Sequence, residues 1–243
     1  LLSSIFVHIQ IFLSLLFFMI PMKYIILSLG GSVVNPGKFD NSFLTSFSEM
    51  IEKYAKKYMF VIVVGGGNVA REYISYARNN GLDEYNLDYI GILGTRMNAM
   101  IVYSHFQKYE NSCYSEHFYD KKCEILITGG TVPGHTTDAV SMLAAEYYKS
   151  KKVINVTSVG GIYDSDPKIN KNAKLIELID YESLLKMFYS EKSNAGPNLV
   201  LDLLSLKIAE RSSIEIDVVG KDIKNIENAI NGEKFQGTVV KKI

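Results

Sequence analysis

Cysteine is scarce in this chain of 243 residues, and histidine is almost as rare. The two cysteines, Cys113 and Cys123, are too few for a disulfide framework and lack the paired CxxC spacing of a zinc site, which favours a reduced, cytoplasmic setting. The four histidines show no metal-ligand spacing, and no Ser/His/Asp or Cys/His arrangement for nucleophilic catalysis is present. The sequence therefore predicts no protein-built metal site.

An excess of charge of either sign is also missing. Lysine and arginine total 26, and aspartate and glutamate total 26. A nucleic-acid-binding protein usually carries a basic excess, so this balance argues against that class. Internal repeats, low-complexity linkers and domain boundaries are absent after residue 22, and we expect one domain over residues 22–243.

The one long hydrophobic run lies at residues 5–22, near the length of about 20 residues that crosses a bilayer. It has no basic segment before it and no small-residue cleavage site, and an expected strand follows at once from Lys23. Met22 would make a natural start. We interpret residues 1–21 as an upstream extension from a misassigned start, with a membrane anchor as the less favoured alternative.

After residue 22, apolar strand-like segments alternate with helical patterns. Continuous apolar strands are typical of parallel sheets covered on both faces, so we predict an α/β fold, a three-layer αβα sandwich with a mainly parallel central sheet. On the longest helix we expect Met97, Met100, Ile101 and Phe106 to face inward. The expected strands are 24–29, 60–64, 124–128, 153–157, 214–219 and an edge strand at 238–241; the expected helices are 40–58, 69–78, 90–109, 137–149, 184–189, 199–211 and 222–231.

Glycine-rich turns follow three of these strands, at residues 29–32, 64–68 and 129–138. Glycine lets the backbone approach a ligand closely, and a helix N-terminus offers free N–H groups to an anion. Ligands of parallel sheets bind beyond the carboxyl ends of the strands, where all three turns lie. The pattern predicts several phosphates held together, as in phosphoryl transfer between two phosphorylated molecules.

Other phosphate motifs fit less well. Gly65, Gly67 and Ala70 satisfy the dinucleotide fingerprint G-x-G-x-x-G/A, but no apolar strand precedes the acidic residues some 20 positions later that would bind a ribose. A Walker loop at residues 31–39 has a gap one residue too long and Phe39 in place of the magnesium-binding Ser or Thr. A tight turn without ligand is the remaining alternative.

Single residues near these turns have both ordinary and functional interpretations. Arg71 is either a solvated helix residue or a bidentate phosphate ligand. Thr136, Thr137 and Asp138 begin a helix, where they cap it and can also contact a phosphate or orient a cation. Asp166 precedes a proline and can cap a turn or bind a ribose.

Taken together, these segments resemble the amino-acid-kinase superfamily and, within it, the archaeal-type uridylate kinases. The similarity covers residues 22–243, and the order and spacing of its motifs are specific. It implies the carbamate-kinase-like fold and the reaction UMP + ATP → UDP + ADP with Mg²⁺, in pyrimidine nucleotide biosynthesis, by an allosteric cytoplasmic homohexamer. The segments are LGGS at 29–32, VVGGGNVAR at 63–71, DYIGILGTRMNAM at 88–100, GGTVPGHTTDA at 129–139 and GIYDSDP at 161–167.

The resemblance also implies a role for each matching residue. Arg71 and Asp138 are then the catalytic residues, Asp138 as the organising aspartate of the superfamily and Arg71, with Gly67, at the transferring phosphate. Gly30, Gly31 and Ser32 line the ATP phosphates, and Thr157, Tyr163 and Asp166 hold the adenine nucleotide. The UMP side comprises Gly66, Asp88 at the ribose, and Thr131, Val132, Pro133, Gly134, His135, Thr136 and Thr137 around the uracil and phosphate.

Two positions depart from the pattern of many relatives. Ser28 stands where a lysine is common, so the stabilising cation is expected from Arg71 or Lys221 together with Mg²⁺. Gly160 replaces an aspartate near the adenine side. Another small-molecule kinase of the same fold, or a non-catalytic nucleotide-binding regulator, is therefore the alternative function.

Overall fold

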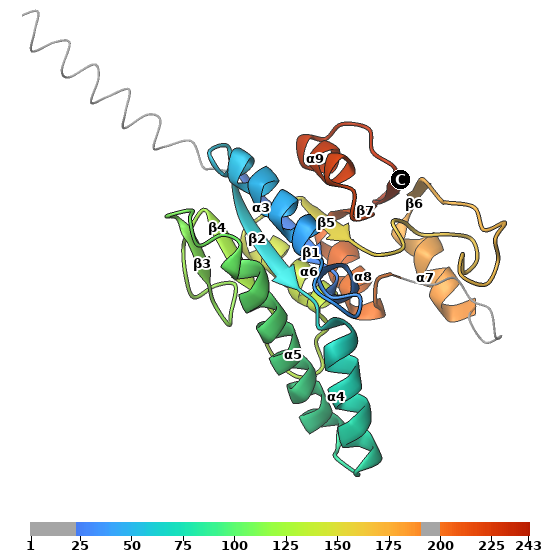
Figure 1. Cartoon of the computed structure of the whole chain (residues 1–243). Coiled ribbons are helices and arrows are strands. Elements are labelled where there is room, and N and C mark those ends of the chain that lie inside the picture. Colours follow the sequence, from blue (N-terminus) through green and yellow to red (C-terminus); the bar gives the residue numbers. More distant parts are fainter. Residues whose placement is uncertain (1–22, 191–199) are drawn as a thin grey trace, which may run out of the picture.

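The computed structural model describes residues 23–190 and 200–243, so the interpretation of residues 1–21 lies outside the described part. Its centre is an eight-stranded sheet with the order β3-β4-β2-β1-β5-β7-β8-β6 (Figure 1). All neighbouring strands pair in parallel except β7 and β8, which are antiparallel. The predicted α/β fold with a mainly parallel sheet is confirmed. The strands are β1 (Lys23–Leu29), β2 (Tyr58–Val64), β3 (Ser112–Tyr114), β4 (Ile125–Thr128), β5 (Lys152–Val156), β6 (Leu178–Ile179), β7 (Glu215–Val219) and β8 (Gly237–Val240).

Helices cover both faces of the sheet and make the outer two layers. Helices α3, α5 and α9 pack on one face, whereas α6, α7 and α8 form the layer on the other. Within the described residues, no helix combines the length and apolar character needed to cross a membrane. The helices are α2 (Gly31–Val34), α3 (Asn41–Ala55), α4 (Gly67–Asn79), α5 (Glu84–Ser104), α6 (Thr137–Tyr147), α7 (Tyr181–Ser190), α8 (Leu203–Ser212) and α9 (Ile223–Asn231).

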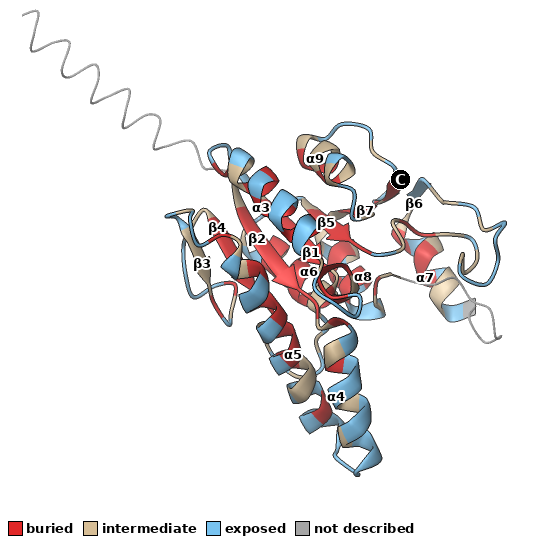
Figure 2. Ribbon diagram, viewed as in Figure 1, coloured by how far each residue is buried: buried red, intermediate tan, exposed pale blue. Residues whose placement is uncertain are grey.

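The central strands are buried on both sides, as their continuous apolar sequences predict (Figure 2). Leu27 and Ile62 belong to the core under α3, and Ile26 and Val63 to the core under α6. Alternation of this kind follows from the two-residue period of a strand. The two cores hold the sheet rigid, so the turns at its carboxyl edge have fixed positions.

Helices α4 and α5 form an antiparallel pair that projects away from the sheet (Figure 1). The prediction for the inner face of α5 is wrong at three positions: Met97 is 51%, Met100 55% and Ile101 38% exposed, and only Phe106 of the four is buried. The buried face instead combines small and polar residues with three large apolar ones; it consists of Leu87, Ile92, Gly94, Thr95, Asn98, Ala99 and Val102. The cause is the close approach of α4, since a Cβ at Gly94 would lie 2.7 Å from the Cβ of Ala70.

The edges of the sheet also differ from expectation. Strand β8 is not the edge, because the two-residue strand β6 pairs with it on its outer side. At the opposite edge, β3 has too little apolar sequence to be predicted. It carries Cys113, which is disulfide-bonded to Cys123 across ten positions of sequence. The structure thus differs from the expectation of two reduced cysteines: the parallel pairing of β3 with β4 places Cys113 beside Leu126, three positions after Cys123, within reach of that residue.

Candidate active site

The first two glycine turns meet because β1 and β2 are parallel neighbours, with Leu29 beside Val64 at their ends. Their backbones touch: a Cβ on Gly31 would lie 2.0 Å from the amide nitrogen of Gly67. Gly67 has a φ of +63°, which favours glycine. Helix α4 begins at this residue. Two glycine turns and a helix N-terminus therefore lie at one corner of the sheet edge. Their free backbone N–H groups could bind an anion there.

A cavity of about 260 Å³ lies against this corner. It is bounded by the start of α4, the first half of α5 and the third glycine turn. Site residues that were predicted in each of these three segments therefore line one cavity. His135 lines the cavity, and its Nδ1 is buried without a hydrogen-bond partner among the described residues. Such an orphaned polar atom is suited to a bound ligand. The predicted residues that line the cavity are Gly66, Gly67, Arg71, Asp88, His135, Thr136 and Thr137.

Arg71 links the first two turns. Its Nη2 donates to Ser32 Oγ at 3.2 Å and to Asn68 Oδ1 at 2.5 Å. The guanidinium is thus held over the Gly31–Gly67 corner while its remaining donors stay available to phosphate oxygens.

Asp88 reaches across the cavity to the third turn. Its Oδ2 accepts a hydrogen bond from the backbone N–H of Gly134 at 2.8 Å, and Gly134 has a φ of +82°. The carboxylate of α5 therefore fixes the turn opposite the phosphate corner. The same turn continues to Thr136, which caps α6 by accepting from the N–H of Ala139.

Asp138 lies in the first turn of α6, behind the first glycine turn. Its Oδ1 accepts from Ser28 Oγ at 2.8 Å and from Asn155 Nδ2 at 3.3 Å, so it joins the ends of β1 and β5. Burial, and secondarily the nearby charge of Asp202, raises its pKa from 3.8 to about 7. Its charge therefore changes near neutral pH, as is typical of functional carboxylates.

Removing the hydroxyl of Ser28 should shift this titration. The Ser28 hydrogen bond favours the ionised carboxylate and lowers the pKa of Asp138, so Ser28→Ala should raise that pKa further above 7. If turnover needs the carboxylate, the acid limb of the pH–rate profile moves to higher pH in Ser28→Ala. An acid limb at the same pH in Ser28→Ala and wild type would mean that turnover does not depend on the charge of Asp138. In the wild-type protein, folded Asp138 keeps a proton between pH 3.8 and about 7 that the unfolded chain releases. The free energy of unfolding therefore falls as the pH rises through that range.

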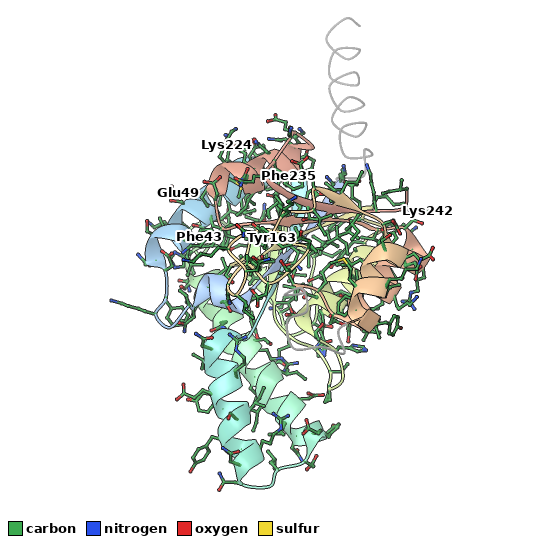
Figure 3. All side chains as sticks on the ribbon, turned by 90° about the vertical axis from the view of Figure 1, so that its right-hand side faces the viewer. Phe43, Glu49, Tyr163, Lys224, Phe235 and Lys242 are labelled. Carbon is green, nitrogen blue, oxygen red and sulfur yellow. A yellow bond between two sulfur atoms is a disulfide. The ribbon has the colours of Figure 1, made fainter. Side chains whose placement is uncertain are left out.

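The residues predicted for the adenine nucleotide lie on the β5 side. Gly30 is adjacent to Thr157, since its N–H donates to Val156 O. Thr157 Oγ1 accepts from the N–H of Gly160, whose φ of +80° explains glycine there. Figure 3 shows Tyr163 in the body of the molecule, away from the projecting α4–α5 pair.

Two of the predicted roles gain no support from contacts in the site. Asp166 caps its own turn by accepting from the N–H of Lys168 at 2.8 Å, and Lys221, considered as a substitute cation, is ion-paired with Asp40 at 2.9 Å. Thr131, Val132 and Pro133 are in the third turn but do not line the cavity.

Sequence reasoning missed Asn98, a buried residue of α5. Its Nδ2 donates to the carbonyls of Gly65 and Gly66, both at 2.9 Å, and so fixes the shape of the triple-glycine turn. The segment containing it was part of the recognised pattern, but no local signal reveals a bond to a turn 32 residues away.

The described side chains around the cavity do not form a metal site of their own. The described residues contain no group of three His, Cys, Asp or Glu side chains able to hold a metal ion. A magnesium ion in this corner would depend on nucleotide phosphates for most of its ligands. A second, larger cavity of about 660 Å³ lies over β7 and β8 beside Lys152 and Asp217, and it includes none of the predicted residues.

A parallel sheet with covered faces, and glycine turns gathered at one carboxyl edge, define a nucleotide- or phosphate-binding α/β protein. Residues 23–220 match the profile of the Amino acid kinase family, and the chain belongs to this family. Its curated relatives include the uridylate kinase of Archaeoglobus fulgidus, 39% identical over 89% of this chain and 99% of the relative, and that of Thermococcus kodakarensis, 40% identical over 89% and 98%.

Solved structures agree with the sequence comparison. The crystal structure of the Archaeoglobus fulgidus uridylate kinase superposes with a TM-score of 0.76 at 37% identity, over 89% of this chain and 99% of that one. The UMP kinase of Ureaplasma parvum, at 24% identity, shares the fold with a TM-score of 0.74 over 90% of this chain and 99% of that one.

Proposed function

We propose that this protein transfers a phosphoryl group from ATP to UMP. The observation that carries the proposal is the junction of the Gly31 and Gly67 turns beside a cavity closed by Thr137. Phosphates of a donor at the first turn and of an acceptor in the cavity would meet end to end there. Curated relatives of nearly equal length are uridylate kinases, which supports UMP as the acceptor.

Each group of residues then has a chemical task. The N–H groups of the Gly30–Ser32 turn and of α4 bind phosphate oxygens, and Arg71 neutralises charge on the group in transfer. Asp88 and the third turn, residues 129–137, hold the nucleoside of UMP; we call residues 129–137 the acceptor loop. Thr157, Tyr163 and Asp166 hold the adenine nucleotide. Phosphoryl transfer depends on positioning and charge neutralisation, which these groups supply without a covalent intermediate.

Magnesium is part of the proposal as the ion that accompanies ATP. It would neutralise charge on the donor phosphates, and Asp138 would orient the groups around it through its hydrogen bonds with Ser28 and Asn155. The protein residues bind and align the nucleotides.

An ADP-release assay with different acceptors tests the function. We expect ADP release with ATP and UMP, and much less with CMP, carbamate or isopentenyl phosphate. Arg71→Ala should lower turnover about thirtyfold, the value of one lost charge-assisted contact. Release that favours another acceptor would support a different small-molecule kinase of this fold, and nucleotide binding without release would support a regulator. Unchanged turnover in Arg71→Ala would remove Arg71 from the mechanism.

We also propose self-association, as a homohexamer. The support is the number of large apolar or aromatic side chains exposed on the α4–α5 pair and the turn between its helices, which is typical of a surface that another subunit covers. Sedimentation velocity would detect it, and a monomer at micromolar concentration would contradict it. The exposed residues on the pair are Tyr73, Tyr76, Leu82, Tyr85, Tyr89, Leu93, Met97, Met100 and Ile101.

A cytoplasmic location completes the proposal, because ATP is the co-substrate. The bond between Cys113 and Cys123 is then expected to be reduced in the cell. Thiol labelling of the protein immediately after lysis tests this, and two blocked cysteines would contradict it.

A further inference from the structure

Helix α5 carries a second residue that contacts a distant turn, Arg96. Its side chain is only 13% exposed and lies between α5, the acceptor loop and the segment that joins β3 to β4. Nε donates to the carbonyl of Gly130 at 3.2 Å, and Nη2 donates to that of Thr131 at 3.5 Å. Nη1 pairs with Glu116 Oε2 at 2.7 Å. One guanidinium therefore joins two consecutive carbonyls of the acceptor loop to a carboxylate.

The neighbouring residue of α5 binds the amide N–H of the same glycine, Gly130. Thr95 Oγ1 accepts from the N–H of Gly130 at 2.6 Å. A Cβ on Gly129 would lie 2.7 Å from this oxygen, so the loop passes against the helix without room for a side chain. The acceptor loop is thus fixed to α5 at its start, before Thr136 and Thr137 reach the cavity.

We propose that Arg96 is a positioning residue that sets the place of the acceptor loop for UMP, with Glu116 orienting its guanidinium. The inference rests on the proposed function, because the acceptor loop is the UMP side of that proposal. The planar guanidinium supplies several donors in fixed directions, whereas a lysine is a single point charge. Glu116 lies in the segment closed by Cys113 and Cys123, so this segment acts on UMP binding through Arg96.

Steady-state kinetics of Arg96→Ala, Arg96→Lys and Glu116→Gln test the inference. We expect Arg96→Ala to raise the KM for UMP about tenfold, the cost of one charged hydrogen-bonding group, while the KM for ATP stays within about twofold. Arg96→Lys should recover part of the loss. Glu116→Gln should raise the KM for UMP by a smaller factor, because the amide oxygen of the new side chain can still accept one hydrogen bond from the guanidinium.

Hydrogen exchange of the purified variants gives a readout that does not depend on turnover. Amides of residues 129–137 should exchange about tenfold faster in Arg96→Ala, with the body of α6 unchanged. The matched control is Arg211→Ala, which breaks another Arg–carboxylate pair, with Glu146, far along α6 and should change neither measurement.

Equal rises in both KM values, or an unchanged KM for UMP together with unchanged exchange in residues 129–137, would overturn the inference. A wild-type protein with no UMP-dependent ADP release would contradict the proposed function instead, while the exchange result would still decide the role of Arg96 in fixing the loop.

Discussion

Gly67→Ala should destabilise the protein by about 2–4 kcal/mol and reduce kcat/KM at least about a hundredfold. The loss of stability has two sources. An alanine at a φ of +63° costs about 1 kcal/mol, and the steric clash of its side chain adds about 1–3 kcal/mol. The new Cβ would lie 2.6 Å from the carbonyl oxygen of Gly31, so the two phosphate turns must separate. A displacement of about 1 Å among reacting groups is enough for the loss of activity. Thermal unfolding and the ADP-release assay measure both effects.

Gly232→Ala is the matched control for this variant. Gly232 has a similar φ of +73° at the end of α9, but a Cβ there would meet nothing within 4 Å. We expect a loss of about 1 kcal/mol in stability and normal turnover. Equal effects of the two substitutions would mean that contact between the phosphate turns has no importance for activity.

Asp138→Asn should lower kcat by about 10²–10³, the usual loss when one preorganised electrostatic group of an active site is removed. Asparagine has the same shape, and its amide oxygen can still accept from Ser28 and Asn155, which both donate to Oδ1 of Asp138, but it cannot supply the charge. The free energy of unfolding should rise above pH 7, because the variant no longer buries an ionised carboxylate. Lower turnover with equal or higher melting temperature therefore distinguishes a functional role from damage to the fold.

Asp180→Asn provides the comparison for Asp138→Asn. Asp180 also accepts a hydrogen bond at the start of a helix, from the N–H of Ser183, but it lies outside the candidate site. We expect normal kcat in this variant. If Asp138→Asn also kept kcat within about threefold of the wild type, the small loss would exclude a major electrostatic role for Asp138.

Features that depend on local chemistry could be predicted from the sequence. Continuous apolar strands indicated the parallel sheet, and the start of the helix expected from residue 40 is confirmed, since Asp40 accepts from the N–H of Phe43 and α3 follows it. The gathering of Arg71 and Thr137 around one cavity followed from a general property of parallel sheets, whose carboxyl ends share an edge.

Features that depend on tertiary contacts could not be predicted from the sequence. The buried face of α5 was predicted wrongly because α4 approaches at Gly94, and hydrophobic periodicity gives no weight to glycine. The start of α5 was placed too late, since the cap at Asp83 precedes any apolar pattern. Asn98 and Arg96 act on backbone groups more than 30 residues away, and such bonds leave no mark in the local sequence.

A crystal structure with UMP and a non-hydrolysable ATP analogue bound together would test the central claim most directly. We predict the UMP phosphate in the cavity between Gly67 and Thr137, and the γ-phosphate of the analogue beside it over Gly31. Two nucleotides on separate faces of the sheet, or UMP in the larger cavity over β7 and β8, would contradict the account.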